Sequence, residues 1–136
     1  MKVILSLLLF FLVTGCCKVY CDGTELGVSF RKFKAVDTDT VLFTKYQPGT
    51  QQTTIIDSFL ISYAIPATDT FQSTVSHSIS SAYDWKITVA SVNKQYIITG
   101  FELTGEHCNC SGKNYKAIKS FLVNGDRKQG LYVDVE

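Results

Sequence analysis

The stretch FQSTVSHSI, residues 71–79, alternates apolar and polar side chains and indicates the fold class of the chain. Phe71, Val75 and Ile79 fall on one face of an extended strand, and the residues that fall on the opposite face are all polar. An α-helix would scatter the three apolar side chains around its circumference. The period of two therefore predicts a half-buried β-strand.

The same period recurs along the chain. The segment IIDSFLISYAI, residues 55–65, places every second residue from Phe59 to Ile65 on one face and stops at Pro66. Similar alternation predicts strands over residues 26–33, 41–46, 85–89, 117–123 and 131–135, and one in which Ile97, Thr99, Phe101 and Leu103 share a face.

Turn signals separate several of these strands. Asn93 and Lys94 are expected to form a turn, and Asn124-Gly125 is the strongest turn signal because both residues tolerate positive φ. The connection over residues 124–129 is expected to be longer than the turns of the tightest hairpins. For residues 114–123 a short helix is the alternative, because Tyr115, Ile118 and Leu122 also fit helical spacing.

These features together predict an all-β fold. Strands at intervals of roughly 8 to 12 residues are typical of a sandwich or a closed sheet. We expect a single antiparallel β-sandwich or β-prism-like domain, stapled by disulfides.

The N-terminus predicts export from the cell. Lys2 is followed by the largely apolar residues 3–13 and then by the small residues Thr14 and Gly15, as in a secretory signal peptide. The apolar run is shorter than the about 20 residues needed to span a membrane. We therefore expect residues 1–16 to be a signal peptide and residues 17–136 to be one secreted β domain without a transmembrane segment.

A second interpretation of the same region stays open. Residues 13–16 also fit the bacterial lipoprotein pattern, in which Cys16 would be lipidated. The alternative location is therefore a membrane surface, to which a lipid on Cys16 would anchor the domain.

Charge argues against nucleic acid as a partner. Removal of the signal peptide takes away Lys2, one of 13 basic residues, and leaves 12 basic residues against 12 acidic ones. A neutral chain has no long-range field to attract nucleic acid or anionic lipid. The short basic stretches at residues 31–34 and 127–128 are read as solvated edges.

Five cysteines lie in two groups, one at each end of the chain: Cys16, Cys17 and Cys21, and Cys108 and Cys110. If Cys16 is lipidated or lost with the signal peptide, an even number remains, and cysteines pair in an oxidising compartment. Cys108 and Cys110 point to opposite faces of an extended chain, so each is expected to bond to a distant partner. We therefore expect two disulfides among Cys17, Cys21, Cys108 and Cys110.

The segment GEHCNCSG, residues 105–112, also suggests a metal site or a glycosylation site. Glu106, His107, Cys108 and Cys110 offer metal-binding atoms, but one residue between the cysteines fits a zinc site poorly, so no metal site is predicted. Asn109-Cys110-Ser111 matches the N-glycosylation triplet, so Asn109 is a candidate for glycosylation.

No catalytic constellation is visible, so no enzyme activity and no cofactor are predicted. No serine has a Gly-x-Ser-x-Gly context, and no phosphate-binding or zinc-protease motif occurs. His77 shares a strand face with apolar neighbours and is read as a core histidine. Glu102 and Glu106 form a loose carboxylate pair in which Glu102 is expected to face water.

Three segments resemble jacalin-related lectins, a sugar-binding family with a three-sided β-prism. They are IIDSFLISYAI, QYIITGFELTG and AIKSFLVNGDR, residues 55–65, 95–105 and 117–127. The family's sugar site usually contains a Gly-x-x-x-Asp loop, and Gly130 to Asp134 has that form. The glycine pairs of the family's early loops and its closing strand are missing here. The resemblance implies that Gly130, Tyr132 and Asp134 bind sugar.

The sequence thus predicts a secreted, disulfide-stabilised binding module for carbohydrate or a cell-surface ligand. An aspartate and backbone amides would hold sugar hydroxyls while an aromatic ring covers the apolar face of the sugar. The alternatives are a protein–protein interaction factor of viral or parasite type, and a small surface lipoprotein.

Overall fold

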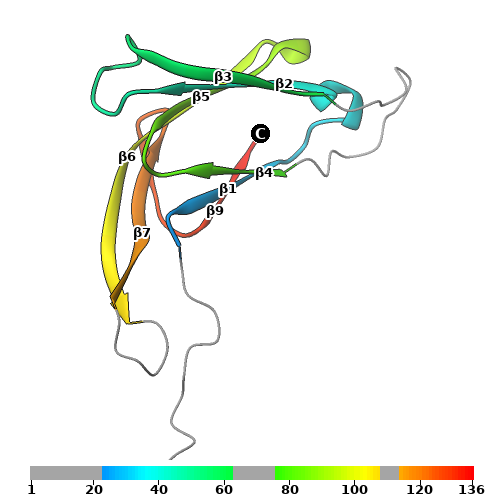
Figure 1. The fold of residues 1–136 in the computed structure, drawn as a ribbon. Helices are drawn as coiled ribbons and strands as arrows, with labels where there is room; N and C mark the ends of the chain where they lie inside the picture. Colours follow the sequence, from blue (N-terminus) through cyan, green and yellow to red (C-terminus); the bar gives the residue numbers. More distant parts are fainter. Residues whose placement is uncertain (1–22, 63–75, 108–113) are drawn as a thin grey trace, which may run out of the picture.

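A computed structural model describes residues 23–62, 76–107 and 114–136, and these residues form two β-sheets (Figure 1). The small sheet has the strand order β4-β1-β9, and the large sheet has the order β3-β2-β5-β6-β7-β8. The strands are β1 (Glu25–Phe30), β2 (Thr40–Tyr46), β3 (Ile55–Ser62), β4 (Ser76–Ser80), β5 (Asp84–Val89), β6 (Lys94–His107), β7 (Asn114–Val123), β8 (Asp126–Lys128) and β9 (Tyr132–Val135). Two short 3₁₀ helices, η1 (Ala35–Thr38) and η2 (Ala90–Val92), complete the described elements. The all-β prediction is confirmed.

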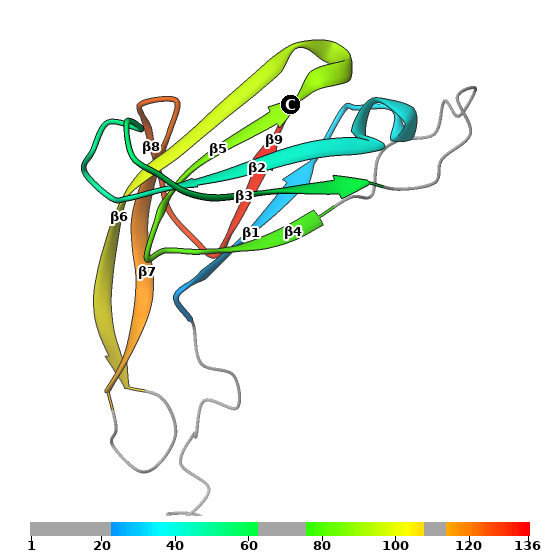
Figure 2. The ribbon, with the colours of Figure 1, turned by 45° about the horizontal axis from the view of Figure 1, so that its top comes forward.

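The two sheets pack face to face as a sandwich (Figure 2). The sequence predicted a β-sandwich or a β-prism-like domain, and the described residues form a two-sheet, sandwich-like fold. Strand pairing is antiparallel except between β1 and β9, which run parallel. A parallel pair needs a long connection between its strands, and here nearly the whole chain lies between β1 and β9.

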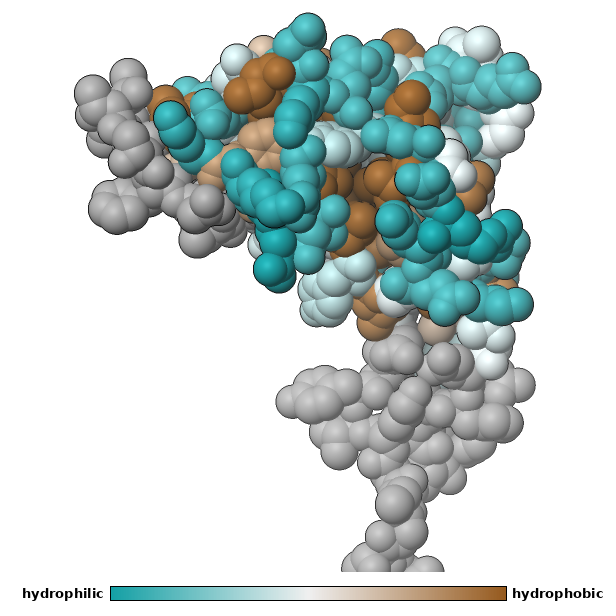
Figure 3. Space-filling model, turned by 180° about the vertical axis from the view of Figure 1, so that it is seen from behind, coloured by the Kyte–Doolittle hydropathy of each residue, from teal (hydrophilic) through white to brown (hydrophobic). Residues whose placement is uncertain are grey.

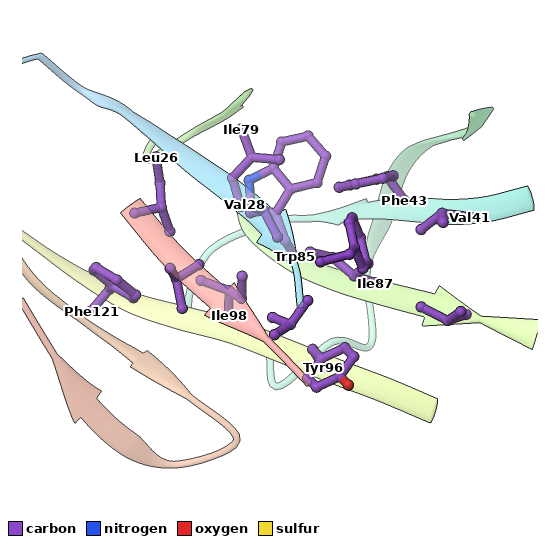
Figure 4. Close-up of a cluster of buried hydrophobic side chains, with 14 of the residues drawn as sticks. Leu26, Val28, Val41, Phe43, Ile79, Trp85, Ile87, Tyr96, Ile98 and Phe121 are labelled. Carbon is purple, nitrogen blue, oxygen red and sulfur yellow. The ribbon is translucent and has the colours of Figure 1, made fainter. Parts of the chain in front are cut away.

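The core lies between the sheets and follows from the period of two. Leu26 and Val28 from the small sheet face Ile87 and Ile98 from the large sheet, and none of these side chains is exposed (Figure 4). Phe43 stacks on Phe59 with ring centroids 5.3 Å apart. One contiguous cluster of buried side chains therefore joins the two sheets.

Strand β6 corrects one part of the sequence prediction. Ile97, Thr99, Phe101 and Leu103 were expected to share one face of the strand, but Tyr96 and Ile98 are the buried residues in its first half. The register of the β6–β7 pair shifts between Thr99 and Glu102, where Gly100 has a φ of 61°. This bulge changes which residues of β6 face the core. Before it the even-numbered residues Tyr96 and Ile98 are buried, and after it the odd-numbered Phe101 packs against the core.

Strand β7 settles the choice between strand and helix for residues 114–123. Backbone hydrogen bonding to both β6 and β8 makes this segment a strand, so the helical alternative was wrong. Asn124 and Gly125 form the predicted turn with φ of 50° and 91°. Val123 pairs with Asp126, so the hairpin is tighter than predicted and β8 was missed.

The β6–β7 hairpin extends beyond the two sheets as an arm (Figure 1). Its outer part pairs Leu103 to His107 of β6 with Asn114 to Ile118 of β7, whereas β5 pairs only with the first residues of β6. The backbone amide of Ile118 donates a hydrogen bond of 3.1 Å to the carbonyl oxygen of Gly23. The start of the described chain therefore lies beside the arm.

Several sequence predictions fall outside the described residues. They concern the signal peptide, all five cysteines, Asn109 and the first half of the 71–79 stretch, of which β4 includes the second half. Within the described ranges no helix is long and apolar enough to cross a membrane. Seen from behind, hydrophobic residues gather at the centre of the visible surface with hydrophilic residues around them (Figure 3).

Candidate functional site

The candidate site is the outer face of the small sheet, which we call the small-sheet face. In each of its strands one set of alternate residues is buried and the other set points outward. The rows that cross this face read Ser80 and Glu25; Ser78, Gly27 and Tyr132; and Ser76, Ser29 and Asp134. The face thus offers hydroxyls, carboxylates and one aromatic ring, with neighbouring strands about 5 Å apart.

Tyr132 lies across Gly27 on the neighbouring strand. A Cβ atom at position 27 would come within 2.5 Å of Tyr132 Cδ1 and 2.8 Å of its Cε1. Only glycine leaves room for the ring at this height above the sheet. Tyr132 is nevertheless 78% exposed, the largest exposed fraction of any bulky apolar or aromatic residue described. One side of the ring is therefore supported by the sheet and the other is open to a ligand.

A hollow of about 550 Å³ lies beside this ring. Its lining comes from all three strands and includes Gly27, Ser29 and Ser78 as well as Leu131 and Tyr132. The volume falls in the range of small-molecule sites. The arrangement suits a ligand that stacks on a ring and exchanges hydrogen bonds with side chains around it.

The polar groups of this face combine donors and acceptors. The Ser78 hydroxyl donates a 2.9 Å hydrogen bond to Glu25 Oε2, which fixes the carboxylate over β1 and β4. Arg31 Nε lies 2.8 Å from Asp134 Oδ1, and both side chains are largely exposed. Asp134 Oδ2 and the remaining guanidinium N–H groups of Arg31 stay available, so the pair can accept from and donate to hydroxyl groups.

The structure places the sequence-predicted binding residues as follows. Tyr132 and Asp134 lie on strand β9 rather than in a loop, and both point outward. Gly130 precedes the strand with a φ of 106°, in the region that favours glycine, and is not in the lining of the hollow. Tyr132 and Asp134 are therefore brought to one face, and Gly130 shapes the entry into β9.

Sequence reasoning missed the partners on β1 and β4 and directly after β1: Glu25, Gly27, Ser29, Arg31 and Ser78. They lie at least 50 positions before Tyr132, and the parallel pairing of β1 with β9 has no local signal. The polar alternation of Ser76 and Ser78 was the one visible hint of an outward hydrophilic face.

His77 faces inward, as expected for a core histidine. Its ring centroid lies 5.0 Å from that of Phe43 and 5.3 Å from that of Phe59. Desolvation between these rings lowers the pKa of His77 from its usual 6.5. The histidine therefore favours its neutral form, and its ring packs at the junction of the sheets although the residue also borders the hollow.

Glu102 takes part in a cross-strand network and not in a carboxylate pair. Arg127 Nη1 donates to Glu102 Oε1 and to Ser120 Oγ at 2.8 Å, and the Ser120 hydroxyl donates to Glu102 Oε2 at 2.9 Å. The hydrogen bond from Arg127, and then that from Ser120, lower the pKa of Glu102. This network ties β6, β7 and β8 together at the bulge.

Within the described ranges, no group of three or more His, Cys, Asp or Glu side chains could hold a metal ion. No family model, no curated protein and no solved structure matches this chain. The geometry of the small-sheet face is therefore the main indication of function.

Proposed function

We propose that this protein is a secreted binding module that recognises carbohydrate on its small-sheet face. The observation that carries the proposal is the exposed ring of Tyr132, which rests on Gly27 with carboxylates and serine hydroxyls around it. Nucleic acid is a poorer candidate, because Glu25 and Asp134 sit on the same face and the formal net charge of the full chain is only +1.

The chemistry of the face fits a sugar in two respects. The open side of an aromatic ring packs on the C–H groups of a pyranose, and its hydroxyl stays wet. Carboxylates, a guanidinium and serine hydroxyls supply both acceptors and donors for sugar hydroxyls. A preformed sheet loses little conformational entropy on binding, because its side chains are already positioned.

A glycan array with purified protein tests this proposal. The wild-type protein is expected to bind one class of glycan, and Tyr132→Ala is expected to lose at least ten-fold in affinity, about 1.4 kcal/mol. Asp134→Asn should weaken binding less, because the amide still accepts a hydrogen bond. Tyr115→Ala on β7 of the arm is the matched control and should bind as the wild type does. Absence of glycan binding by the folded wild-type protein would overturn the proposal.

The resemblance to jacalin-related lectins supports the same ligand class. Its three segments include β3, β6, β7 and the turn into β8 of the large sheet, whereas Tyr132 and Asp134 belong to the small sheet. The proposal therefore depends on the geometry around Tyr132 and uses the resemblance only as a pointer to sugar.

We further propose that disulfides fasten the N-terminal segment to the tip of the arm. Gly23 is hydrogen-bonded to Ile118 of β7, and Cys21 precedes Gly23 by two residues, a reach of about 7 Å in extended chain. Cys108 and Cys110 belong to the segment that joins β6 to β7. Pairing of Cys17 and Cys21 with Cys108 and Cys110 would close loops of 87 or more residues, which constrains the unfolded chain by about 4 kcal/mol in the entropy model.

Intact mass of the secreted protein, with and without reduction before alkylation, tests the disulfides, the signal peptide and the modifications together. If two disulfides are present, four cysteines are alkylated after reduction, and the same four are not alkylated without reduction. The same spectrum reports cleavage after residue 16 and a glycan on Asn109. Labelling with palmitate that is lost in Cys16→Ala would instead establish the lipoprotein alternative.

A protein partner is the second candidate, and one observation favours it. On the outer face of the large sheet, Leu42 and Leu60 lie directly opposite each other, and Ile56 lies further along β3. All three are exposed, and β3 is an edge strand of its sheet. We call these three residues the large-sheet face. Exposed apolar area at a free strand edge is typical of protein–protein interaction sites.

A further inference from the structure

A second cavity, of about 480 Å³, lies between the connection from β2 to β3 and the bulged part of β6. The connection contributes Gly49, Gln51 and Gln52, and β6 contributes Thr99 and Phe101. Asp84, at the start of β5, also lines it. This cavity and the hollow on the small-sheet face have no lining residue in common.

Asp84 is a carboxylate that the protein itself leaves short of partners. The residue is only 7% exposed, and its side chain accepts one hydrogen bond, from the Gly49 amide to Oδ2 at 3.1 Å. No Lys or Arg in the described ranges lies within ion-pair distance of it. A cation that entered the cavity would therefore be the first ion-pair partner of Asp84 among the described residues.

The second carboxylate oxygen of Asp84, Oδ1, has no hydrogen-bond partner among the described residues. Every described side-chain nitrogen or oxygen that is cut off from solvent has a hydrogen-bond partner. Asp84 Oδ1 has none in the described part of the chain, so it keeps contact with solvent, and the cavity is the opening that Asp84 lines. A ligand in this cavity can therefore reach an oxygen of the Asp84 side chain that has no partner among the described residues.

The loop over the cavity holds an unusual backbone. Gln51 and Gln52 both have positive φ, 50° and 63°, in the region that favours glycine. Two consecutive strained glutamines cost free energy that the surroundings must offset, and such strain gathers at ligand-binding segments. Both side chains carry amides beside the cavity, where they can accept and donate hydrogen bonds.

We propose that this cavity binds an organic cation, an ammonium or guanidinium group on an apolar stem, with Asp84 as its counter-ion. The charged group would sit against Asp84 Oδ1, and the stem would pack on Phe101, Ile97 and Pro48, which also line the cavity. Two sources share this chemistry, namely a Lys or Arg side chain of a partner protein and a free polyamine.

NMR titration of the ¹⁵N-labelled secreted protein tests the proposal. The probes are N-acetyl-arginine methylamide, N-acetyl-lysine methylamide and putrescine, with neutral N-acetyl-norleucine methylamide as the matched probe. At least one cationic probe is expected to shift the amide resonances of Gly49 and Thr99, and the neutral probe is not. Stronger binding of the acetylated amino acids would identify a protein side chain as the source, and stronger binding of putrescine a free amine.

Asp84→Asn isolates the charge. The asparagine oxygen can still accept the Gly49 hydrogen bond, so the fold should persist while the affinity for the cationic probe falls at least ten-fold. Asp57→Asn on β3 removes the same charge from a residue outside the cavity and should change the affinity less than two-fold. If Asp84→Asn does not fold, the comparison of the cationic probes with the neutral probe on the wild-type protein still tests the proposal.

Three results would overturn the proposal. They are equal binding of the neutral probe, shifts confined to resonances away from Gly49 and Thr99, and a response of these resonances to CaCl₂ but to no organic cation. Each would mean that the cavity is not a site in which Asp84 pairs with an organic cation.

Discussion

The outer faces of the two sheets differ although both sheets share one core. The small-sheet face has serines, two carboxylates and a tyrosine supported by a glycine. The large-sheet face has Leu42, Ile56 and Leu60, all exposed to solvent. A period of two decides which side chains point inward, but it leaves the outward positions free to carry different chemistry.

The difference indicates what each face can do. A polar outer face with one supported ring can bind and release a hydrated ligand, because its hydroxyls are satisfied by water in the free state. Exposed leucine and isoleucine side chains gain about 25 cal/mol for each Å² that a partner covers. The small-sheet face is therefore the better candidate for the proposed sugar site, and the large-sheet face for the proposed protein contact.

The largest expected effect tests whether the two faces belong to one folding unit. Phe43 is fully buried and contacts rings from both sheets, Phe30 in the small sheet and Phe59 in the large one. Phe43→Ala should lower the free energy of unfolding by about 3 to 5 kcal/mol, through lost burial and a residual cavity. Urea unfolding followed by the fluorescence of Trp85, the single tryptophan, measures this loss.

The same experiment reports on cooperativity. Far-ultraviolet circular dichroism and Trp85 fluorescence should give one coincident transition in the wild type and in Phe43→Ala. Two separate transitions would mean that the sheets unfold independently, and that their outer faces belong to different units.

The next largest effect concerns the glycine under Tyr132. Gly27→Ala places a methyl group 2.5 Å from Tyr132 Cδ1, so the ring must move off the sheet. We expect sugar affinity to fall about as much as in Tyr132→Ala, at least ten-fold or about 1.4 kcal/mol. Isothermal titration with the best glycan from the array measures the change.

Gly105→Ala on β6 is the control for this change. A Cβ atom at Gly105 meets no atom within 4 Å, so this substitution adds the same methyl group without displacing a ring. Full sugar affinity in Gly27→Ala would show that the position of the Tyr132 ring does not matter, and would remove the main support for the small-sheet face as a sugar site.

Local patterns predicted most of the strands, because several of them bury one face and expose the other. The inward positions of β5 could be assigned from alternation alone, and Asn124-Gly125 identified its hairpin. Alternation failed at β6, since a bulge at Gly100 exchanges the two faces and the sequence holds no sign of it beyond the glycine.

Only part of the candidate site could be predicted for a similar reason. Tyr132 and Asp134 stood out as neighbours in sequence, but Glu25 and Gly27 join them only through the parallel pairing of β1 with β9. Pairing between distant strands depends on how the sheets pack, and one sequence does not show that. The cavity at Asp84 was missed because it unites three segments that are each unremarkable.

A smaller effect concerns the pH dependence of the junction between the sheets. His77 has a lowered pKa in the folded protein because Phe43 and Phe59 desolvate it. Below about pH 6.5 the unfolded chain binds a proton that the folded protein resists, so stability should fall as the pH decreases through this range. His77→Phe keeps a ring between these neighbours and cannot titrate.

Urea unfolding of the wild type and of His77→Phe at pH 7.5 and pH 5.5 measures this contribution. The wild type should lose more stability on acidification than the variant does. His107 and all carboxylates are present in both proteins, so their contributions cancel in the comparison. Equal losses would show that His77 titrates alike in the folded and unfolded chain.

The smallest expected effect on stability belongs to the large-sheet face. Leu60 is 58% exposed, so Leu60→Ser should change the free energy of unfolding by about 0.5 kcal/mol or less and should leave sugar affinity unchanged. Retention of a protein partner in a pull-down should nevertheless fall, because the partner can no longer cover the apolar side chain of Leu60. Leu103→Ser on β6 removes an exposed leucine from outside this face and should retain the partner. If both substitutions lower retention equally, apolar area anywhere on the surface holds the partner, and the contrast between the two outer faces has no functional meaning.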